Sequence, residues 1–409
     1  MPEWPIVRFH TLAADSKSAF SKPYGSAITK EDYLPHGVPV VRGINLRKGI
    51  FQDDEFVYIS EETADKMPGA NLAAGDLVLT HRGTIGQVSM IPRHPRYARY
   101  VLSTSQVKAR LDPRRALPEF YYYWFSSPEG THELLGNVST VGVPGLAQPV
   151  ATIKSLRVPH PSLATQKAIA DILGALDDKI AINERITQSI LSLADSIFAL
   201  LVATEDLKAE TFGALASVLG GGTPRTTEPS YWDGGIAWAT PSDVTALSSP
   251  YLFETQRTIT DSGLASCSSK LYPAGSIFMT SRATIGVFAV PQIPAAVNQG
   301  FIVVVPPTEE LRWWLFHEIR SRVDEMISLA NGSTFLELSR TNFKQMYVRL
   351  ASEEVIRRFN QRVNPLHSMA AVCEKEIFAV RELRDALLPR LMSGEIRVRD
   401  AERIVEGST

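Results

Sequence analysis

The sequence has almost no cysteine. Of 409 residues only Cys267 and Cys373 are cysteines, so the chain can build neither a disulfide framework nor a cysteine-based zinc site. Lys and Arg number 42 against 44 Asp and Glu, and this near-neutral total argues against a polybasic coat. No uninterrupted apolar run approaches the roughly 18 residues of a membrane span, and the start lacks a basic-then-apolar signal pattern. We therefore expect a soluble, cytoplasmic protein.

Motifs that carry catalysis are also missing. The sequence has no Gly-rich P-loop for ATP phosphates, no Gly-x-Ser-x-Gly elbow, and no Asn-Pro-Pro-aromatic string that would position an amino group for methyl transfer. Its histidines have no His-x-x-x-His spacing, so no metal site is expected. A lone Asp206-Leu-Lys208 is interpreted as part of a solvated linker. The sequence predicts a non-enzymatic chain without a cofactor of its own.

An internal repeat organises the chain. Arg82-Gly-Thr-Ile-Gly86 recurs as Arg282-Ala-Thr-Ile-Gly286, each after an apolar run. Further matches follow in the same order in both copies: 36–46 with 234–244, Gln106 with Gln299, and the aromatic run 120–125 with 313–316. This order predicts two diverged copies of about 190 residues in tandem. Short apolar runs broken by Gly and Pro loops predict an α+β globular domain in each copy. The aromatic runs are expected to pack in the core.

Each copy ends in a long heptad pattern. Apolar residues recur at alternating spacings of four and three over 169–201 and 356–391, which predicts two helices that pair with each other. The predicted seam residues are Leu176, Ile180, Asn183, Ile190 and Ile197 in the first helix and Leu366, Cys373, Ile377 and Val380 in the second. The polar seam positions Asn183, Thr187 and Arg384 either fix the register or are merely tolerated.

Each heptad pattern is interrupted early. Pro365 after Asn364, a good N-cap, predicts that a short helix ends near residue 363 and a longer one begins. Asp177 marks the corresponding place in the first copy. The segment from 177 to about 201 would measure roughly 37 Å at 1.5 Å per residue. Residues 202–212 are expected to form a polar link.

The second copy opens with Gly220-Gly-Gly-Thr-Pro-Arg225 and continues to Asp243 in a string that closely resembles the opening of target-recognition domains in the specificity subunit of Type I restriction–modification enzymes. The two Arg-x-Thr-Ile-Gly turns, the string 166–180 and the ending 383–396 match the same family, in order, over essentially the whole chain. The first copy departs from the family at its opening, where Pro23-Tyr-Gly-Ser26 replaces the Gly-Gly-Thr-Pro string.

The resemblance implies a fold. The expected class is α+β, with two tandem α/β target-recognition domains separated by long antiparallel coiled-coil helices in a pseudo-two-fold internal repeat. The expected domains are a first target-recognition domain at 1–160, a central helical spacer at 161–207, a second target-recognition domain at 208–350, a C-terminal helical spacer at 351–393 and a tail at 394–409.

The resemblance also implies a function. The chain would recognise a bipartite double-stranded DNA target, one half-site per domain, with the helices as a ruler whose length is close to one turn of B-DNA. It would dock two methyltransferase (modification) subunits and, through them, restriction (motor-nuclease) subunits, with no membrane partner. S-adenosylmethionine would belong to the methyltransferase partner, and ATP and Mg to the restriction partner.

Loops beside rigid strands are the expected DNA contacts. Arg82 and Arg282 are either forks for phosphate or guanine or structural parts of their turns. The predicted contacts are Arg42, Asn45, His81, Arg82, Thr84, Arg93, Arg96 and Arg99 in the first copy and Thr223, Arg225, Thr226, Ser242, Arg282 and Thr284 in the second. The stretch 81–115 holds eight Lys and Arg against Asp112 alone, which predicts a phosphate-facing patch without an equivalent in the second copy.

Two functions of other classes compete with this interpretation. One is a self-contained restriction or modifying enzyme with a degenerate active site, which methyl transfer by the purified chain would favour. The other is a coiled-coil scaffold without a DNA role, which sequence-independent and salt-insensitive behaviour would favour.

Overall fold

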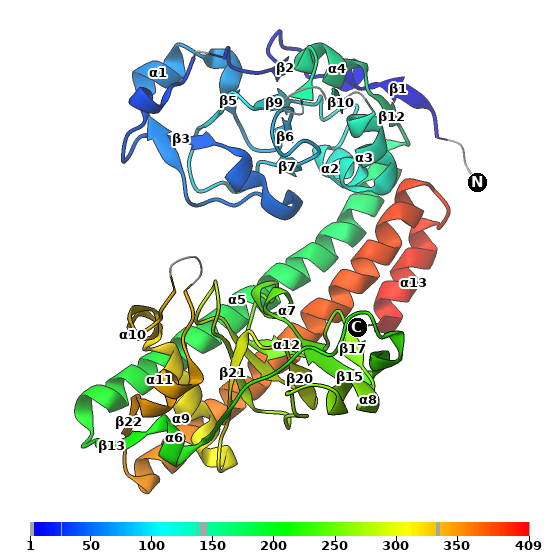
Figure 1. The fold of residues 1–409 in the computed structure, drawn as a ribbon. Coiled ribbons are helices and arrows are strands. Elements are labelled where there is room, and N and C mark those ends of the chain that lie inside the picture. The colour runs from blue at the N-terminus through cyan, green and yellow to red at the C-terminus, as the bar shows by residue number, and fades with distance from the viewer. Residues whose placement is uncertain (1–3, 26, 137, 140–144, 333–335, 409) are drawn as a thin grey trace. The chain divides into compact units, whose positions relative to one another are not determined.

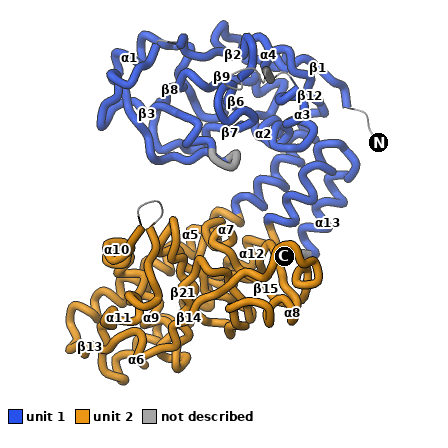
Figure 2. Tube along the Cα trace, viewed as in Figure 1, with its two compact units in different colours: residues 1–178, 381–409 blue, residues 179–380 orange. Residues whose placement is uncertain are grey.

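The computed structural model describes residues 4–25, 27–136, 138–139, 145–332 and 336–408 (Figure 1). The chain divides into two compact units, residues 1–178 with 381–409 and residues 179–380 (Figure 2). Both divisions fall inside long helices, α5 (Leu163–Thr204) and α12 (Glu353–Met392). Each unit therefore combines a globular part with a segment of both helices.

Among its described residues unit 1 contains two four-stranded sheets and two strand pairs, β1-β12 and β10 (Val138–Ser139) with β11 (Gly145–Leu146). The strand orders of the two sheets are β2-β9-β6-β7 and β4-β3-β8-β5. The strands are β2 (Phe20–Ser21), β3 (Val38–Val41), β4 (Val57–Ile59), β5 (Asn71–Leu72), β6 (Leu77–Thr80), β7 (Val88–Met90), β8 (Tyr100–Leu102) and β9 (Gln106–Ala109), with β1 (Ile6–Arg8) paired to β12 (Arg157–Pro159). Besides its segments of α5 and α12, the helices are η1 (Phe9–Leu12), η2 (Lys30–Asp32), η3 (Gly43–Gly49), α1 (Glu61–Asp65), η4 (Pro68–Ala70), α2 (Pro118–Ser126), α3 (Pro128–Leu135), α4 (Pro149–Ser155) and α13 (Val398–Ser408).

Unit 2 repeats this plan. Its strand orders are β14-β21-β18-β19-β16 and β17-β15-β20. The strands are β14 (Ser217–Leu219), β15 (Trp232–Ala239), β16 (Tyr251–Leu252), β17 (Thr258–Ile259), β18 (Ile277–Thr280), β19 (Phe288–Pro291), β20 (Ala295–Val297) and β21 (Phe301–Val305), with β13 (Lys208–Thr211) paired to β22 (Tyr347–Leu350). The helices are α6 (Phe212–Leu215), η5 (Pro229–Tyr231), α7 (Pro241–Thr245), α8 (Asp261–Ala265), α9 (Glu309–Arg320), α10 (Val323–Ser328) and α11 (Arg340–Gln345).

The predicted repeat is confirmed by this topology, because β2-β9-β6-β7 corresponds strand for strand to β14-β21-β18-β19. The aromatic runs lie in corresponding helices, α2 and α9, and pack in the core as expected. One pairing is wrong. Thr80 pairs with Gln106 and Thr280 pairs with Phe301, so Phe301 is the counterpart of Gln106, and Thr104 that of Gln299. The error arose because the chain between the paired strands is five residues shorter in unit 2, 281–300, than in unit 1, 81–105.

The two long helices pack antiparallel. In unit 1, Asp177 of α5 pairs with Arg384 of α12 (2.8 Å). In unit 2, the Asn183 amide donates to Glu376 (2.7 Å), and Phe198 packs against Phe359. The partner number falls as the α5 number rises, which fixes the antiparallel direction. Among the predicted seam residues, Leu176, Ile180, Asn183, Ile190, Cys373, Ile377 and Val380 are buried, and Ile197 and Leu366 are half-buried.

The seam of unit 2 is shared with the globular part. Ile190 and Phe198 of α5 and Phe359 of α12 belong to one buried cluster with Phe212 and Trp314. The helices therefore complete the core of the unit instead of forming a free-standing coiled coil, and their burial contributes to its hydrophobic stabilisation.

The predicted helix interruptions are wrong. α5 and α12 each run through without a break. The Asn364 side chain does not cap a helix, because it accepts a hydrogen bond from the Trp313 indole (2.9 Å). Asp177 likewise accepts from the Tyr123 hydroxyl (2.7 Å) and pairs with Arg384. Tertiary partners take both side chains, and Pro365 removes a single backbone donor from a helix held by packing.

Two predictions about the ends of α5 and of the chain also need correction. The expected polar link at 202–212 contains the last turn of α5 and strand β13, which is held by antiparallel pairing to β22. The expected tail, 394–409, contains helix α13, whose Ala401 is buried.

Helix α5 is long and apolar enough to cross a membrane by length and composition, with a mean hydropathy of 1.7 over its most apolar window. The sequence prediction missed this because polar residues interrupt the apolar run. Its buried side chains pack against α12 and the core of unit 2, so we interpret α5 as a core helix.

A buried polar chain joins four elements of unit 2. The His317 ring of α9 pairs with Asp195 of α5 (2.7 Å) and contacts the His367 ring of α12 (3.0 Å between Nε2 atoms). His367 contacts the Tyr251 hydroxyl of β16 (2.8 Å). Every contact is satisfied when Tyr251 donates to His367, His367 to His317, and His317 to the Asp195 carboxylate, with both imidazoles neutral.

Burial keeps both imidazoles of this hydrogen-bonded chain neutral. It lowers the pKa of His317, against the opposing pull of Asp195. Burial, with His317 and Arg320 nearby, lowers the pKa of His367 to about 2. Trp313 stacks on the His367 ring at 3.5 Å between centroids, which leaves no room for water above that face. Protonation of either ring would place a charge in this core.

Acid should destabilise unit 2. Both imidazoles stay neutral in the folded protein but take up protons near pH 6.5 in the unfolded protein. The free energy of unfolding therefore has its full value above that pH. It falls as the pH drops below it, by up to about 1.4 kcal/mol per pH unit for each histidine. Urea unfolding midpoints measured from neutral pH downward would show this slope. His367→Phe should flatten it, whereas exposed His94→Gln should not; an equal slope in both variants would contradict the assignment.

Candidate nucleic-acid interface

The two Arg-x-Thr-Ile-Gly turns have the same backbone. Each follows the central strand of a sheet, β6 or β18. Gly83 and Ala283 occupy the same position and both have positive φ, +87° and +58°. Ala283 is strained there, because a side chain disfavours the left-handed region by about 1–2 kcal/mol. A turn that keeps this conformation despite alanine is held by its surroundings, and it presents Thr84 and Thr284 at the surface.

The arginines of the two turns differ in their partners. Arg282 forms an ion pair with Glu337 (2.8 Å), and both side chains are nearly half exposed. The backbones of Arg282 and Glu337 also form an isolated β-bridge, and the corresponding β-bridge of Arg82 is to Gly145. Among the described residues the Arg82 side chain has no carboxylate partner. Arg82 is therefore available to an anion, whereas an anion at Arg282 must compete with Glu337. Surface pairs of this kind are weak enough to be exchanged.

Three other predicted residues of unit 1 are held inside it. Asn45 is fully buried; its Oδ1 accepts from the Arg42 amide (2.9 Å), and its Nδ2 donates to the Asp54 carbonyl (2.7 Å). Arg42 is half-buried and donates to the Glu55 carbonyl (3.1 Å). His81 is buried against the Thr104 carbonyl (3.1 Å), and burial lowers its pKa. The structure argues against a base contact by Asn45, because its amide is already used.

The predicted basic patch has more acidic partners than the sequence count indicated. Folding brings Glu119 to Arg93, Glu61 and Asp65 to Arg99, Asp76 to Arg110, and Asp112 to Arg114 and Arg115. Lys108 is buried, which lowers its pKa to about 8, and it donates to the Asn71 carbonyl (2.8 Å). Arg96 is exposed beside Tyr97. Asp112 is the single acid within 81–115, but folding adds acids from outside that stretch. Among the described residues the guanidinium groups of Arg82 and Arg96 have no carboxylate partner, although the Arg96 backbone amide donates to Asp53 (2.8 Å).

The loop Gly220–Thr226, here called the Gly-Thr-Pro loop, is held by its carbonyls. These accept hydrogen bonds from Tyr272 at Gly220, Ser268 at Gly221 (3.0 Å), the Trp238 indole at Gly222 (3.1 Å) and the Trp232 indole at Arg225 (3.1 Å). A Cβ on Gly221 would lie 2.6 Å from the Val297 carbonyl carbon, so glycine is required. The backbone is fixed before any ligand arrives.

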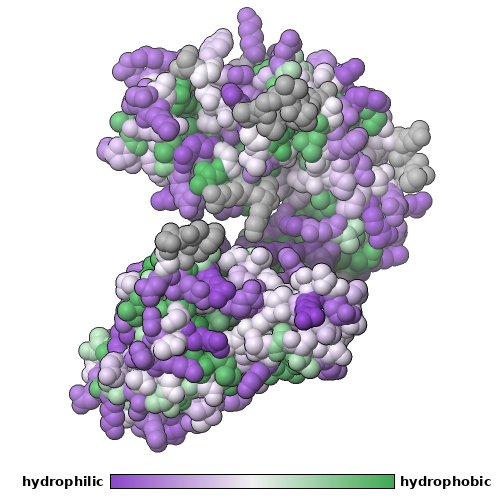
Figure 3. Space-filling model, viewed as in Figure 1, coloured by the Kyte–Doolittle hydropathy of each residue, from purple (hydrophilic) through white to green (hydrophobic). Residues whose placement is uncertain are grey.

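The side chains of this loop point outward. Thr223, Arg225 and Thr226 are exposed, as is Ser242 at the start of α7. Arg257, which no sequence motif marks, is exposed, and its guanidinium lies 3.4 Å from the Trp232 ring centre. Its only signal was a lone arginine in an unremarkable loop. On the face shown in Figure 3, residues of intermediate hydropathy cover much of unit 2 over β15 and α8.

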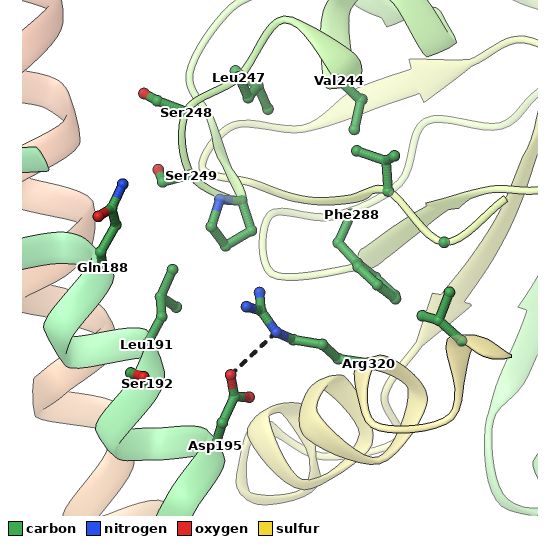
Figure 4. A pocket seen from close by; sticks show the side chains of 14 residues that line it. Gln188, Leu191, Ser192, Asp195, Val244, Leu247, Ser248, Ser249, Phe288 and Arg320 are labelled. Carbon is green, nitrogen blue, oxygen red and sulfur yellow. Dashed lines mark ion pairs between the residues drawn. The ribbon is translucent and has the colours of Figure 1, made fainter. Parts of the chain in front are cut away.

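A cavity of about 530 Å³ lies in unit 2 between α5 and the globular part (Figure 4). Gln188, Leu191 and Asp195 of α5 line one side, and Phe288 and Arg320 line the other. The Asp195 carboxylate pairs with Arg320 (3.3 Å) as well as with His317. Within the described part of the chain, no cluster of His, Cys, Asp or Glu could hold a metal ion.

Comparisons with known proteins agree on one family. A model described as the Type I restriction modification DNA specificity domain matches residues 23–192 and 205–355. The chain is 32% identical over 142 residues to the type I restriction enzyme MjaIX specificity subunit of Methanocaldococcus jannaschii, covering 34% of the chain but only 33% of that subunit. It is 24% identical over 375 residues to the HindI specificity subunit of Haemophilus influenzae, covering 73% of the chain and 81% of the relative.

One solved structure has the same fold. The Type-I restriction-modification system S subunit from M. genitalium matches with a TM-score of 0.60 at 15% identity, covering 95% of this chain and 96% of that one.

The shared turn can be tested by substitution. Gly83→Ala should cost about 1 kcal/mol of stability, because a Cβ there meets open space and only the positive φ is penalised. Gly286→Ala should cost more, since its Cβ would lie 2.9 Å from Val323 Cγ2. Adding Val323→Ala should recover part of the second loss. Denaturation of the single and double variants measures this; equal costs at both glycines would disprove the packing argument.

Proposed function

Because the chain belongs to the Type I restriction-modification DNA specificity family, we propose that its two globular parts each recognise one half-site of a bipartite double-stranded DNA target. The matched relatives are specificity subunits, so the chain is a non-catalytic recognition component. The observation that carries the proposal is the repeated scaffold itself, with the same exposed turn, Arg82-Gly-Thr84 and Arg282-Ala-Thr284, after the same strand in both units.

The proposed contacts divide by chemistry. Arg82, Arg282, Arg225 and Arg96 are cationic and exposed, and guanidinium groups suit phosphate oxygens and guanine edges. Thr84, Thr223, Thr226, Ser242 and Thr284 offer hydroxyls from short, stiff side chains. Phosphate contacts position the protein, and base contacts specify the sequence.

The long helices are proposed as the ruler between the half-sites. α5 is one uninterrupted helix of 42 residues, about 63 Å at 1.5 Å per residue, and so it is longer than the segment of roughly 37 Å that the sequence predicted from residue 177. The hydrogen bond from buried Asn183 to half-buried Glu376 supports a fixed register against α12, since a polar seam position disfavours slipped pairings.

The same helices are proposed to dock two methyltransferase subunits, and through them restriction subunits. Exposed apolar residues follow α5 at intervals of four and seven, on a face away from the seam: Ile182, Ile186, Leu193 and Leu200. An exposed apolar stripe of this kind suits a partner helix. In this proposal S-adenosylmethionine is bound by the methyltransferase, and ATP and Mg by the restriction subunit, in the cytoplasm.

Reconstitution tests the function. The purified chain should neither methylate nor cleave DNA, and methylation should appear when the modification subunits of the same system are added. Mapping of methylated bases in a host that carries the complex should return one motif of two separated parts. Methyl transfer by the chain alone, or a contiguous motif, would contradict the proposal.

Removing the internal competitor of Arg282 should strengthen DNA binding. Glu337→Gln frees the guanidinium and removes one negative charge, so we expect severalfold tighter binding and a steeper dependence of affinity on salt. Arg282→Ala should have the opposite effect. Titrations over a range of salt concentrations measure both. Glu353→Gln, an exposed acid at the start of α12, is the matched control, and an equal gain from it would refute the role of Arg282.

Docking can be separated from DNA binding. Leu193 and Leu200 are 50% and 63% exposed, so a charge there should not disturb the core. Leu193→Glu with Leu200→Glu should abolish co-purification with modification subunits and leave DNA affinity unchanged. Ser189→Glu places one such charge on an exposed position of the same helix and should retain the complex. Retention by the leucine variant would eliminate this face as the docking surface.

A further inference from the structure

Gln299 lies where the candidate segments of unit 2 meet. It is exposed in the loop between β20 and β21. On one side the Gly222 amide donates to the Val297 carbonyl (3.1 Å), which ties this loop to the Gly-Thr-Pro loop. On another, the Ser281 amide donates to the Gly300 carbonyl (2.8 Å), next to Arg282. The segments that carry Thr223 and Arg282 therefore flank Gln299.

The backbone around Gln299 is fixed on both sides. The Asn298 amide donates to the Ala239 carbonyl at the end of β15 (3.0 Å), and the Asn298 side chain accepts from the Gly300 amide (2.8 Å). A Cβ on Gly300 would lie 2.8 Å from Pro241 Cγ, at the start of α7. These contacts hold the loop close to α7, where Ser242 is exposed.

The Gln299 side chain is oriented as well. The Thr223 hydroxyl donates to Gln299 Oε1 at 2.6 Å. In this arrangement the carbonyl end of the amide faces Thr223, and among the described residues no other hydrogen bond holds the Gln299 amide. An exposed amide normally turns freely, so a partner that fixes it reduces the entropy lost on binding.

The two copies differ at this position. The counterpart of Gln299 in unit 1 is Thr104, whose carbonyl is occupied by His81. The surrounding strands correspond, so the difference lies in the chemical group presented and not in the scaffold that presents it. A residue that changes while its support is retained has the placement of a specificity determinant.

An oriented carboxamide matches one base pair. It offers one donor and one acceptor side by side, and adenine presents the complementary acceptor N7 and donor N6 in the major groove. Resting on the function proposed above, we propose that Gln299 recognises an adenine of an A·T pair in the half-site bound by unit 2, with Thr223 as its positioning residue.

The test maps the methylated motif of the complete complex. Gln299→Ala should make one position of one half-site degenerate, with a discrimination loss of roughly 5- to 140-fold, as one bidentate contact provides. Gln299→Glu should shift that position from A·T toward C·G, because a carboxylate accepts from cytosine N4. The other half-site and the spacing should not change. Thermal melting checks that both variants fold.

Thr223 is tested by rescue. Thr223→Val keeps the shape but removes the hydrogen bond, and it should weaken discrimination at the same position. Thr223→Ser restores the hydroxyl and should restore discrimination, which a purely structural role would not predict.

The outcomes separate the two proposals. A wild-type complex without a bipartite motif would contradict the proposed function. With that motif present, a folded Gln299→Ala complex that methylates the unchanged motif, or that loses methylation at every site, would overturn the role of Gln299 alone.

Discussion

The antiparallel pairing of α5 with α12 is the constraint on which both units depend. Each unit takes in one segment of each helix, so its core includes chain segments about two hundred residues apart. In unit 2 this dependence is explicit, because Phe198 and Phe359 share one buried cluster with the globular part. Segments so distant in sequence come into contact only with a large loss of conformational entropy of the chain between them. The globular parts and the helices are therefore expected to fold together.

The sequence predicted the features that are repeated or periodic. The two copies, the heptad seam and the buried aromatic helices are patterns whose period survives divergence. It failed where a tertiary partner overrides a local signal. Asn364 and Pro365 read locally as a helix boundary, but the Trp313 indole takes the asparagine side chain and packing carries the helix through.

The candidate site was predictable in part for the same reason. Both Arg-x-Thr-Ile-Gly turns and the Gly-Thr-Pro loop were found as motifs, and the structure places their side chains at the surface. For Asn45 the sequence carries no such information, because only the three-dimensional surroundings show that its amide is used by the backbone. Gln299 was noticed only as a match in the repeat, and in the wrong alignment. Its place among three segments depends on hydrogen bonds that no local pattern encodes.

The buried histidine pair gives unit 2 ring protons that NMR spectroscopy can follow. The His317 and His367 rings are 1% and 0% exposed and hydrogen bonded to each other, so their ring protons are shielded from exchange with water. Imidazole protons on most proteins exchange too quickly to be observed, whereas these should give separate downfield proton resonances in NMR spectra. Because the pair touches α5, α9, α12 and β16 at once, those resonances would report whether the helices stay seated on the globular part while DNA or another subunit binds.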